Sequence, residues 1–275
     1  MAASAGGRAG GSAGHSGGVQ PEPITATPPP LPGRPVLRQS WRDLTFLHWR
    51  VEADVVTPLL PAGTRPDVHD GTSWVGLVPF RMVDAGAARG PGIPWLGSFP
   101  ETNVRLYSVD EQGRRAVVFR TLEAARLPFV LGSRAALALP YTWARMRVTE
   151  VDGVVTYSSR RRWPGPRDAT TRVVVRPGEP LAPGYALADF LTARWALHTR
   201  AFGRTLHLPN THEPWPLRTA ELLELDDHLL AACGLPGVAT RPPDSVLFSR
   251  GDRTTFGTPA DARAPRPGTG RATGA

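Results

Sequence analysis

Residues 144–163 read ARMRVTEVDGVVTYSSRRRW, two alternating runs on either side of Asp152-Gly153. Apolar side chains at every second position are typical of strands with one buried face. An Asp-Gly pair favours a tight turn between antiparallel strands, because both residues tolerate a positive φ. The stretch therefore predicts a β-hairpin with strands over 144–151 and 154–163.

A second hairpin is predicted on the N-terminal side of the first. Its strands, over 102–109 and 115–121, flank the turn-forming residues Asp110-Glu111-Gln112-Gly113. Residues 69–71, His-Asp-Gly, also predict a turn into a strand. Shorter runs rich in β-branched and aromatic residues predict further strands over 45–51, 73–82 and 172–176.

Two segments near the C-terminus carry the spacing of amphipathic helices, 186–200 and 219–233. Thr219 is placed to cap the start of the second helix and Gly234 to cap its end. Because the hairpins do not alternate regularly with helices, the pattern favours an antiparallel α+β fold over a parallel one.

Composition predicts one ordered domain between two tails. Residues 1–36 consist mostly of Gly, Ala, Ser and Pro, and cannot bury enough apolar surface to offset the entropy of ordering. Residues 257–275 have the same character. We therefore expect a disordered tail over 1–36, a single domain over 37–256 and a second disordered tail over 257–275. The first tail is not expected to be a signal peptide, because no cationic start leads into an apolar run.

The sequence holds no apolar run of the roughly 18 residues that a membrane helix needs, so no membrane partner is expected. Its single cysteine, Cys233, excludes an internal disulfide and is expected to be a small buried thiol. A reducing cytoplasm is therefore the expected compartment.

Positive charge does not by itself indicate a nucleic-acid partner here. The formal net charge is +8, and all 32 basic residues are arginine. The only dense run, Arg160-Arg161-Arg162, is typical of the solvated face of a strand, and no basic face with interleaved aromatic residues is visible. We predict no specific nucleic-acid partner.

The segment Ser98-Phe-Pro-Glu-Thr-Asn-Val-Arg-Leu-Tyr107 offers the clearest row of functional groups. If it is extended from Glu101, then Glu101, Asn103, Arg105 and Tyr107 share one face. Arg105 could grip a carboxylate with its two-pronged guanidinium, and Glu101 could act as a general acid or base if burial raises its pKa. The alternative is an ordinary strand surface facing solvent.

Two histidines are further candidates for ligand binding. His48 lies between large apolar residues in Phe46-Leu47-His48-Trp49, where a structural role is the alternative. His212 lies in the aromatic segment Thr211-His-Glu-Pro-Trp-Pro-Leu217, which could line a pocket. His207 and His212 would face opposite sides of a strand, so we predict no metal site. No phosphate-binding glycine loop is present, and no cofactor is expected.

Several segments in this order resemble the YqjF-like family, domain of unknown function 2071, over about residues 37–249. The segments are Phe46-Leu47-His48-Trp49, Leu59-Leu60-Pro61, Asp70-Gly71, Trp74-Val-Gly-Leu-Val-Pro-Phe80, Phe99-Pro-Glu-Thr-Asn-Val-Arg105, Leu139-Pro140-Tyr141 and His212-Glu-Pro-Trp-Pro-Leu217. The family is grouped by fold with acetoacetate decarboxylase. The resemblance implies an antiparallel β-barrel or cone with a few packed helices and a central pocket.

The resemblance also bears on chemistry. In acetoacetate decarboxylases a lysine forms a Schiff base with a β-keto acid, helped by a glutamate and an arginine, for which Glu101 and Arg105 are the matching candidates. The lysine has no counterpart, because the chain contains no lysine. We therefore expect a small anionic or carbonyl-bearing molecule to be bound without Schiff-base chemistry. Two function classes stay open, a non-catalytic binding protein and a lyase or isomerase that uses Glu101 as acid or base; the sequence leaves the oligomeric state undetermined.

Overall fold

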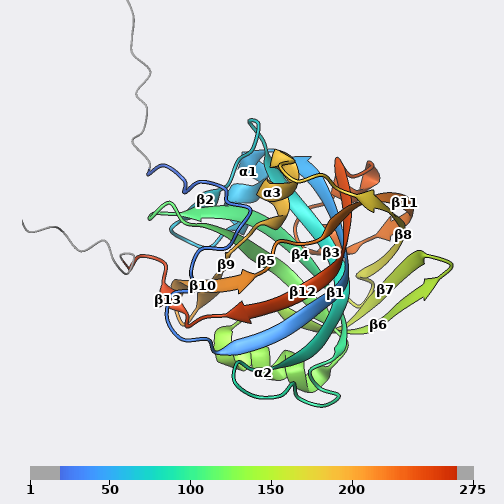
Figure 1. The fold of residues 1–275 in the computed structure, drawn as a ribbon, viewed down its shortest axis with the longest axis horizontal. Helices are drawn as coiled ribbons and strands as arrows, with labels where there is room; N and C mark the ends of the chain where they lie inside the picture. The colour runs from blue at the N-terminus through green and yellow to red at the C-terminus, as the bar shows by residue number, and fades with distance from the viewer. Residues whose placement is uncertain (1–18, 265–275) are drawn as a thin grey trace, which may run out of the picture.

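A computed structural model describes residues 19–264 of the chain, which form mostly β-strands with a few helices (Figure 1). The strands are β1 (Leu37–Val51), β2 (Thr64–Pro66), β3 (Ser73–Ala87), β4 (Phe99–Asp110), β5 (Arg115–Ala124), β6 (Tyr141–Val151), β7 (Val154–Trp163), β8 (Thr170–Pro180), β9 (Ala196–Ala201), β10 (Arg204–His212), β11 (Leu217–Asp227), β12 (Ser245–Phe256) and β13 (Ala260–Asp261). The helical segments are α1 (Ala53–Val56), η1 (Thr57–Leu59), α2 (Leu127–Leu137), α3 (Ala186–Thr192), α4 (Leu229–Ala232) and η2 (Val238–Thr240). Within residues 19–264, none of the helices has the length and apolar character that a bilayer crossing requires.

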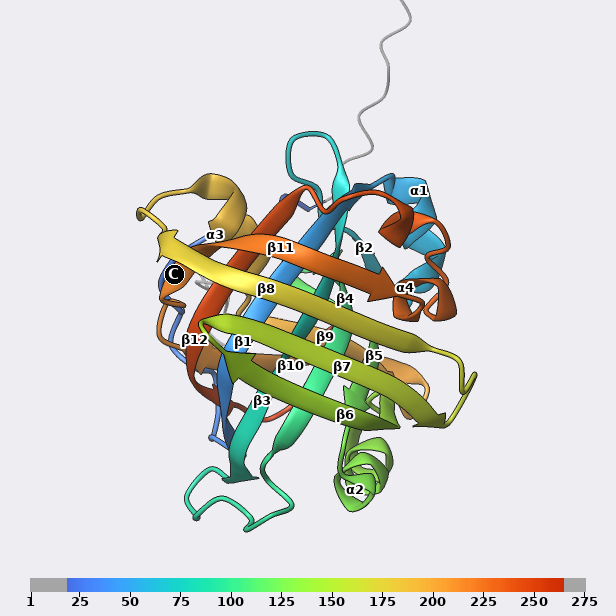
Figure 2. The same cartoon turned by 90° about the vertical axis from the view of Figure 1, so that its right-hand side faces the viewer.

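Pairing between strands forms a ring. It runs through β1, β3, β4, β5, β9, β10 and β12, and we call it the strand ring. The ring is uneven, because β5 and β9 meet in parallel at one pair of residues, Val117 opposite Leu197. The strands β6, β7, β8 and β11 form a second layer that crosses one face of the ring (Figure 2).

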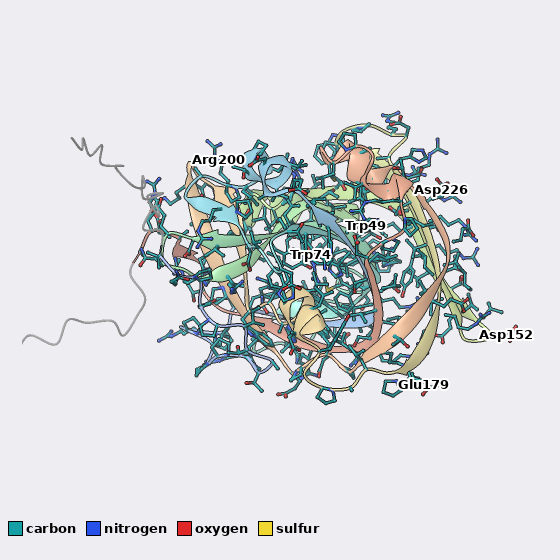
Figure 3. The ribbon with its side chains drawn as sticks, turned by 90° about the horizontal axis from the view of Figure 1, so that it is seen from above. Trp49, Trp74, Asp152, Glu179, Arg200 and Asp226 are labelled. Carbon is teal, nitrogen blue, oxygen red and sulfur yellow. The ribbon has the colours of Figure 1, made fainter. Side chains whose placement is uncertain are left out.

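The long strands β1, β3 and β4 are buried on both faces. On β4, Val104 and Leu106 pack toward the second layer, where they meet Val155 and Val173. The alternate side chains of the same strand point into the strand ring. Viewed from above, the buried Trp49 and Trp74 lie near the middle of the molecule, whereas Asp152, Glu179 and Asp226 lie at its edge (Figure 3).

The two predicted hairpins are present. Asp152 and Gly153 join β6 to β7 with φ values of 51° and 74°, and Val151 lies opposite Val154. The second hairpin joins β4 to β5 through Gly113, whose φ is 76°. Most pairings are antiparallel, as expected; β5 also pairs in parallel with β6 and β9.

The first predicted helix, 186–200, is shorter than expected. The helix α3 ends at Thr192, and β9 begins at Ala196, where it pairs with β10. Pairing with β10 satisfies the backbone groups of this segment, so tertiary context overrides its helical spacing. The apolar stretch after Arg126 forms a helix that we did not predict, α2.

The second predicted helix, 219–233, is wrong over most of its length. Residues 217–227 form β11, which pairs with β8 and β12, and only the short α4 follows. The register of β11 shifts between Leu222 and Glu224, and Leu222 and Leu225 both pack against the same core. Because of this irregularity, Leu222 and Leu225 lie on the same side of β11 although they are three positions apart. A spacing of three is also typical of one face of a helix.

Parts of both expected tails contact the strands. In residues 19–36, the backbone N–H of Glu22 donates to the Gly113 carbonyl oxygen, and the Trp195 indole donates to the Thr25 carbonyl oxygen at 3.1 Å. In residues 257–264, β13 pairs with β10. Residues 19–36 and 257–264, expected to be disordered, therefore form hydrogen bonds with the domain. The rest of the predicted tails, 1–18 and 265–275, lies outside the described residues.

Candidate functional site

The strand β4 presents the predicted row of side chains to the interior of the strand ring. Glu101, Asn103, Arg105 and Tyr107 are all buried, with at most 4% of their surface exposed. The predicted alternative, a solvent-facing strand surface, is therefore wrong for all four. Glu101 and Arg105 are four positions apart on an extended strand, about 13 Å between their Cα atoms, so the two groups lie in different parts of the row.

Glu101 lies in an apolar cavity of about 280 Å³ between the ring and α2. The hydroxyl of Tyr141 donates to Glu101 Oε2 at 3.2 Å, and Glu101 forms no ion pair within residues 19–264. Burial raises the pKa of Glu101 from 4.5 to about 8, against the opposing effect of the Tyr141 hydrogen bond. At neutral pH the group is therefore mostly a neutral carboxylic acid, which can donate a hydrogen bond.

Arg105 lies at the other end, beside α3. Its Nε donates to the Tyr107 hydroxyl at 3.1 Å and its Nη2 to the Leu191 carbonyl oxygen at 3.0 Å. No carboxylate of the described chain forms an ion pair with it, whereas the neighbouring buried Arg194 is paired with Asp67. A buried guanidinium without a carboxylate carries an uncompensated charge, which favours an anionic ligand.

A second, small cavity lies beside Arg105. It has a volume of about 20 Å³, and Arg105, Asn210 and His212 are among the side chains that line it. Four of its walls also line the cavity of Glu101, namely Trp41, Phe119, Leu197 and Phe256. The two cavities therefore adjoin, and we call them together the ring cavity.

His48 supports Arg105 from β1. Its Nε2 lies 2.7 Å from the Tyr107 hydroxyl, which itself donates to the Leu191 carbonyl oxygen. The His48 Nε2–H must therefore be the donor, and its buried Nδ1 has no partner in the described part of the chain. Burial lowers the pKa of His48 well below 6.5, and the charges of Arg105 and Arg194 lower it further. His48 does not line the ring cavity, and it acts by positioning Tyr107.

His212 is held between two indole rings. Its ring centroid lies 4.6 Å from that of Trp195 and 4.1 Å from that of Trp215, and Trp215 stacks in turn on Trp41. The His212 Nδ1 lies 2.7 Å from the Glu213 carbonyl oxygen, so it carries the hydrogen. Burial lowers the pKa of His212 to about 4. At neutral pH its Nε2 is therefore an acceptor without a proton, on a residue that lines the ring cavity.

Asn103, between Glu101 and Arg105, differs from its neighbours. Its Oδ1 is buried and has no hydrogen-bond partner within residues 19–264. Most residues that line the ring cavity were not predicted as site residues, among them Tyr141, Asn210 and Trp41. Tyr141 stands in the motif Leu139-Pro140-Tyr141, so its place in the sequence was visible but its contact with Glu101 was not.

One group of side chains outside the ring cavity has the spacing of a metal site. Ligand atoms of Asp110, His198 and His207 lie within 4.8 Å of one another. However, the Arg114 Nε donates to Asp110 Oδ2 at 2.7 Å, and the His198 Nδ1 lies 2.9 Å from the Ser108 hydroxyl. A fixed guanidinium on the carboxylate opposes a cation there, so this cluster fits a structural network better than a metal centre.

Comparison with known proteins places the chain in a family and a fold. Residues 38–253 match a family described as an uncharacterised conserved protein, domain of unknown function 2071. The uncharacterised protein YqjF of Bacillus subtilis (strain 168) is 32% identical over 190 residues, which cover 68% of this chain and 76% of YqjF.

Solved structures with the same fold are distant in sequence. An acetoacetate decarboxylase of Legionella pneumophila is 14% identical, with a TM-score of 0.56 over 85% of this chain and 90% of its own. An acetoacetate decarboxylase-like enzyme of Sphingomonas wittichii is 13% identical, with a TM-score of 0.57 over 83% and 93%. The enduracididine biosynthesis enzyme MppR complexed with pyruvate is 13% identical, with a TM-score of 0.53 over 85% and 92%. At these identities the likeness shows the fold alone.

Proposed function

Since the chain belongs to the YqjF-like family of uncharacterised conserved proteins and has an acetoacetate decarboxylase-like fold, we propose that the ring cavity binds a small carboxylate that also bears a carbonyl group. The strand ring would then serve as the barrel or cone that the family resemblance implies, with the ligand at its centre. Because the sequence contains no lysine, the proposed binding does not involve a Schiff base with a lysine side chain.

The buried charge of Arg105 carries this proposal. Its guanidinium faces a cavity and lacks a carboxylate partner in the described chain, so a ligand carboxylate would neutralise it. Tyr107 and the Leu191 carbonyl oxygen hold the group in a fixed orientation. Glu101, protonated at neutral pH, supplies a hydrogen-bond donor at the other end of the cavity, for a carbonyl oxygen of a ligand long enough to reach it from Arg105.

Binding of pyruvate and acetoacetate by the full chain, measured by isothermal titration calorimetry, tests the proposal. The Arg105→Gln variant loses a charge-assisted contact, so its affinity for the keto acid should be at least about tenfold lower than that of the wild type. The control variant Arg200→Gln, changed on the exposed face of β9, should keep the wild-type affinity. A thermal melt of each variant separates lost binding from lost folding. Equal affinities of wild type and Arg105→Gln, or no saturable binding of short keto acids by the wild type, would contradict it.

A catalytic role is the second candidate, and the raised pKa of Glu101 favours it. A carboxyl group with a pKa of about 8 can both donate and accept a proton near neutral pH, as a lyase or isomerase requires. In its ionised fraction the group would accept a proton from the carbon next to a ligand carbonyl, and it would return a proton taken from solvent, which exchanges that hydrogen. Proton NMR in D₂O should then show faster exchange of the methyl hydrogens of pyruvate with wild type than with Glu101→Gln, whereas equal rates would leave only the binding function.

A further inference from the structure

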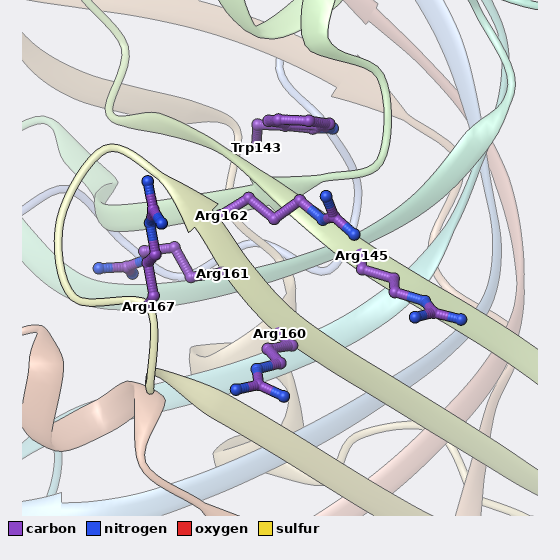
Figure 4. Close-up of a pocket in the computed structure, with 6 residues that line it drawn as sticks. All are labelled: Trp143, Arg145, Arg160, Arg161, Arg162 and Arg167. Atoms are coloured by element: carbon purple, nitrogen blue, oxygen red, sulfur yellow. The ribbon is translucent and has the colours of Figure 1, made fainter.

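A concave arginine-rich face lies on the second layer, away from the ring cavity. Arg145 on β6, Arg160 and Arg162 on β7 and Arg167 in the loop after β7 surround a cavity of about 370 Å³ (Figure 4). All four are exposed, and with Trp143 we call them the arginine face. Arg161 also lines the cavity but is buried and bound to Glu123, so its charge is already compensated.

The arginine face lacks the counter-charges that the exposed arginines of the adjoining strand β8 possess. No carboxylate in residues 19–264 forms an ion pair with Arg145, Arg160, Arg162 or Arg167. On the adjoining β8 and β11, by contrast, the exposed arginines are paired, Arg172 with Glu224 at 2.8 Å and Arg176 with Glu221 at 2.9 Å. The presence of arginine is by itself uninformative in a chain without lysine. The difference in ion pairing between the arginine face and β8 is informative, because both belong to the same layer.

Two of the unpaired charges face each other directly. Arg145 and Arg160 are opposite residues in the ladder between β6 and β7, and like charges in that position destabilise a sheet. The guanidinium of Arg162 lies 5.2 Å above the Trp143 ring, which fixes its direction over the cavity. The fold therefore holds four positive charges around one cavity at a cost that a bound polyanion would remove.

We propose that the arginine face binds the di- or triphosphate group of a small phosphorylated molecule. In a phosphate chain the terminal phosphoryl group carries about −1.5 to −2 charges near neutral pH and each inner group about −1, so a di- or triphosphate brings about −3 to −4 charges to four guanidinium groups. Guanidinium groups bind phosphate oxygens through paired N–H donors, and groups on two neighbouring strands can reach a short phosphate chain from both sides. A hollow of about 370 Å³, lined by residues of two strands and one loop, has the size of a small molecule and not of a long polymer.

Titration of the full chain with inorganic triphosphate, near physiological ionic strength and without divalent metal, tests this. The variant is Arg145→Gln/Arg160→Gln, and the matched control is Arg172→Gln/Arg176→Gln, which removes the same charge from the same layer. We expect saturable binding by the wild type, a loss of about tenfold or more in the variant and less than about twofold in the control. Without ligand, the variant should also melt at a higher temperature than the wild type, because the opposed charges are gone.

Titration with ATP, orthophosphate and a single-stranded oligonucleotide shows which kind of phosphate compound the arginine face binds. ATP that binds as well as triphosphate, or better, supports the proposal and shows whether a nucleoside adds contacts. The proposal is overturned by an absence of saturable triphosphate binding, by equal losses in variant and control, or by orthophosphate that binds as tightly as triphosphate. Binding of a single-stranded oligonucleotide without binding of triphosphate would likewise overturn it in favour of a nucleic-acid surface.

Discussion

Gly76 on β3 lies directly against His48 on β1: a Cβ atom at Gly76 would come within 2.9 Å of the His48 Nε2 and 3.2 Å of the Arg105 Cγ. The two residues are opposite each other in the ladder between β1 and β3. The missing side chain at Gly76 therefore makes the space in which His48 and Arg105 meet Tyr107.

Gly76→Ala should destabilise the fold by about 1–3 kcal/mol, because buried side chains must move to accept the methyl group. Urea unfolding measures the change. Gly132→Ala in α2 is the control, since a Cβ there meets no atom within 4 Å and alanine should instead stabilise the helix by up to about 1 kcal/mol. A Gly76→Ala variant as stable as the wild type would show that His48 and Arg105 can shift freely.

The pKa of Glu101 predicts a pH dependence of stability. The folded protein holds the proton up to about pH 8, whereas the unfolded chain releases it near 4.5, so folding takes up a proton between these values. The stabilising effect is therefore complete below about pH 4.5 and is lost as the pH rises toward 8, by on the order of 3–5 kcal/mol. Glu101→Gln, which is neutral at every pH and keeps an acceptor for Tyr141, should show a flatter profile. Chemical unfolding at about pH 5 and pH 8 measures both, and parallel profiles would contradict the prediction.

Borohydride reduction in the presence of acetoacetate or pyruvate should trap no adduct between residues 37 and 256. Imine formation needs an uncharged primary amine, and arginine supplies none because it stays protonated. Decarboxylation of acetoacetate by the purified protein should be negligible for the same reason. Intact-mass and peptide mass spectrometry detect any adduct, and one mapped inside these residues would require a nucleophile that the sequence does not reveal.

Removal of residues 1–36 should lower the melting temperature, whereas removal of residues 1–18 alone should leave it nearly unchanged. The longer deletion removes the hydrogen bonds of Glu22 with Gly113 and Arg115 and those of Thr25 with Trp195. The shorter deletion removes none of them. Calorimetric melts compare the two, and identical melting temperatures would mean that these bonds merely replace bonds to water.

The hairpins could be predicted because their signals are local. Asp152-Gly153 determines a turn through the conformations of two adjacent residues. The alternation of β4 predicted that Glu101, Asn103, Arg105 and Tyr107 share one face, whereas the burial of that face became known only from the structure. The helix predicted over 219–233 was wrong because the leucines of this segment have helical spacing, which in the structure arises from an irregularity in the pairing of β11 with β8. No property of a single sequence window reports such a shift, since the partner strand determines it.

The site could be predicted only as a set of chemical groups. Spacing placed Glu101 and Arg105 in one row, but their separation into two ends of a cavity depends on walls supplied by Trp41, Phe119 and Leu197 from other strands. The partnership of Glu101 with Tyr141 spans 40 positions, and that of Arg105 with Leu191 spans 86. Contacts at this range follow from tertiary packing and have no local signature.

The order of the strands also bears on how the protein behaves in a crowded solution. A thirteen-strand sheet would ordinarily offer two long edges, on which other chains could add strands and aggregate. Here the ends of the order are β13, with 2 residues, and β2, with 3 residues that include Pro66. Edge strands this short offer few backbone groups with which another chain could pair, and in β2 the proline also lacks an N–H donor. Within residues 19–264, the two ends of the strand order are thus protected against edge-to-edge self-association. On β6, whose residues 144–151 pair only with β7, the exposed Arg145 and Arg147 oppose it by their charge.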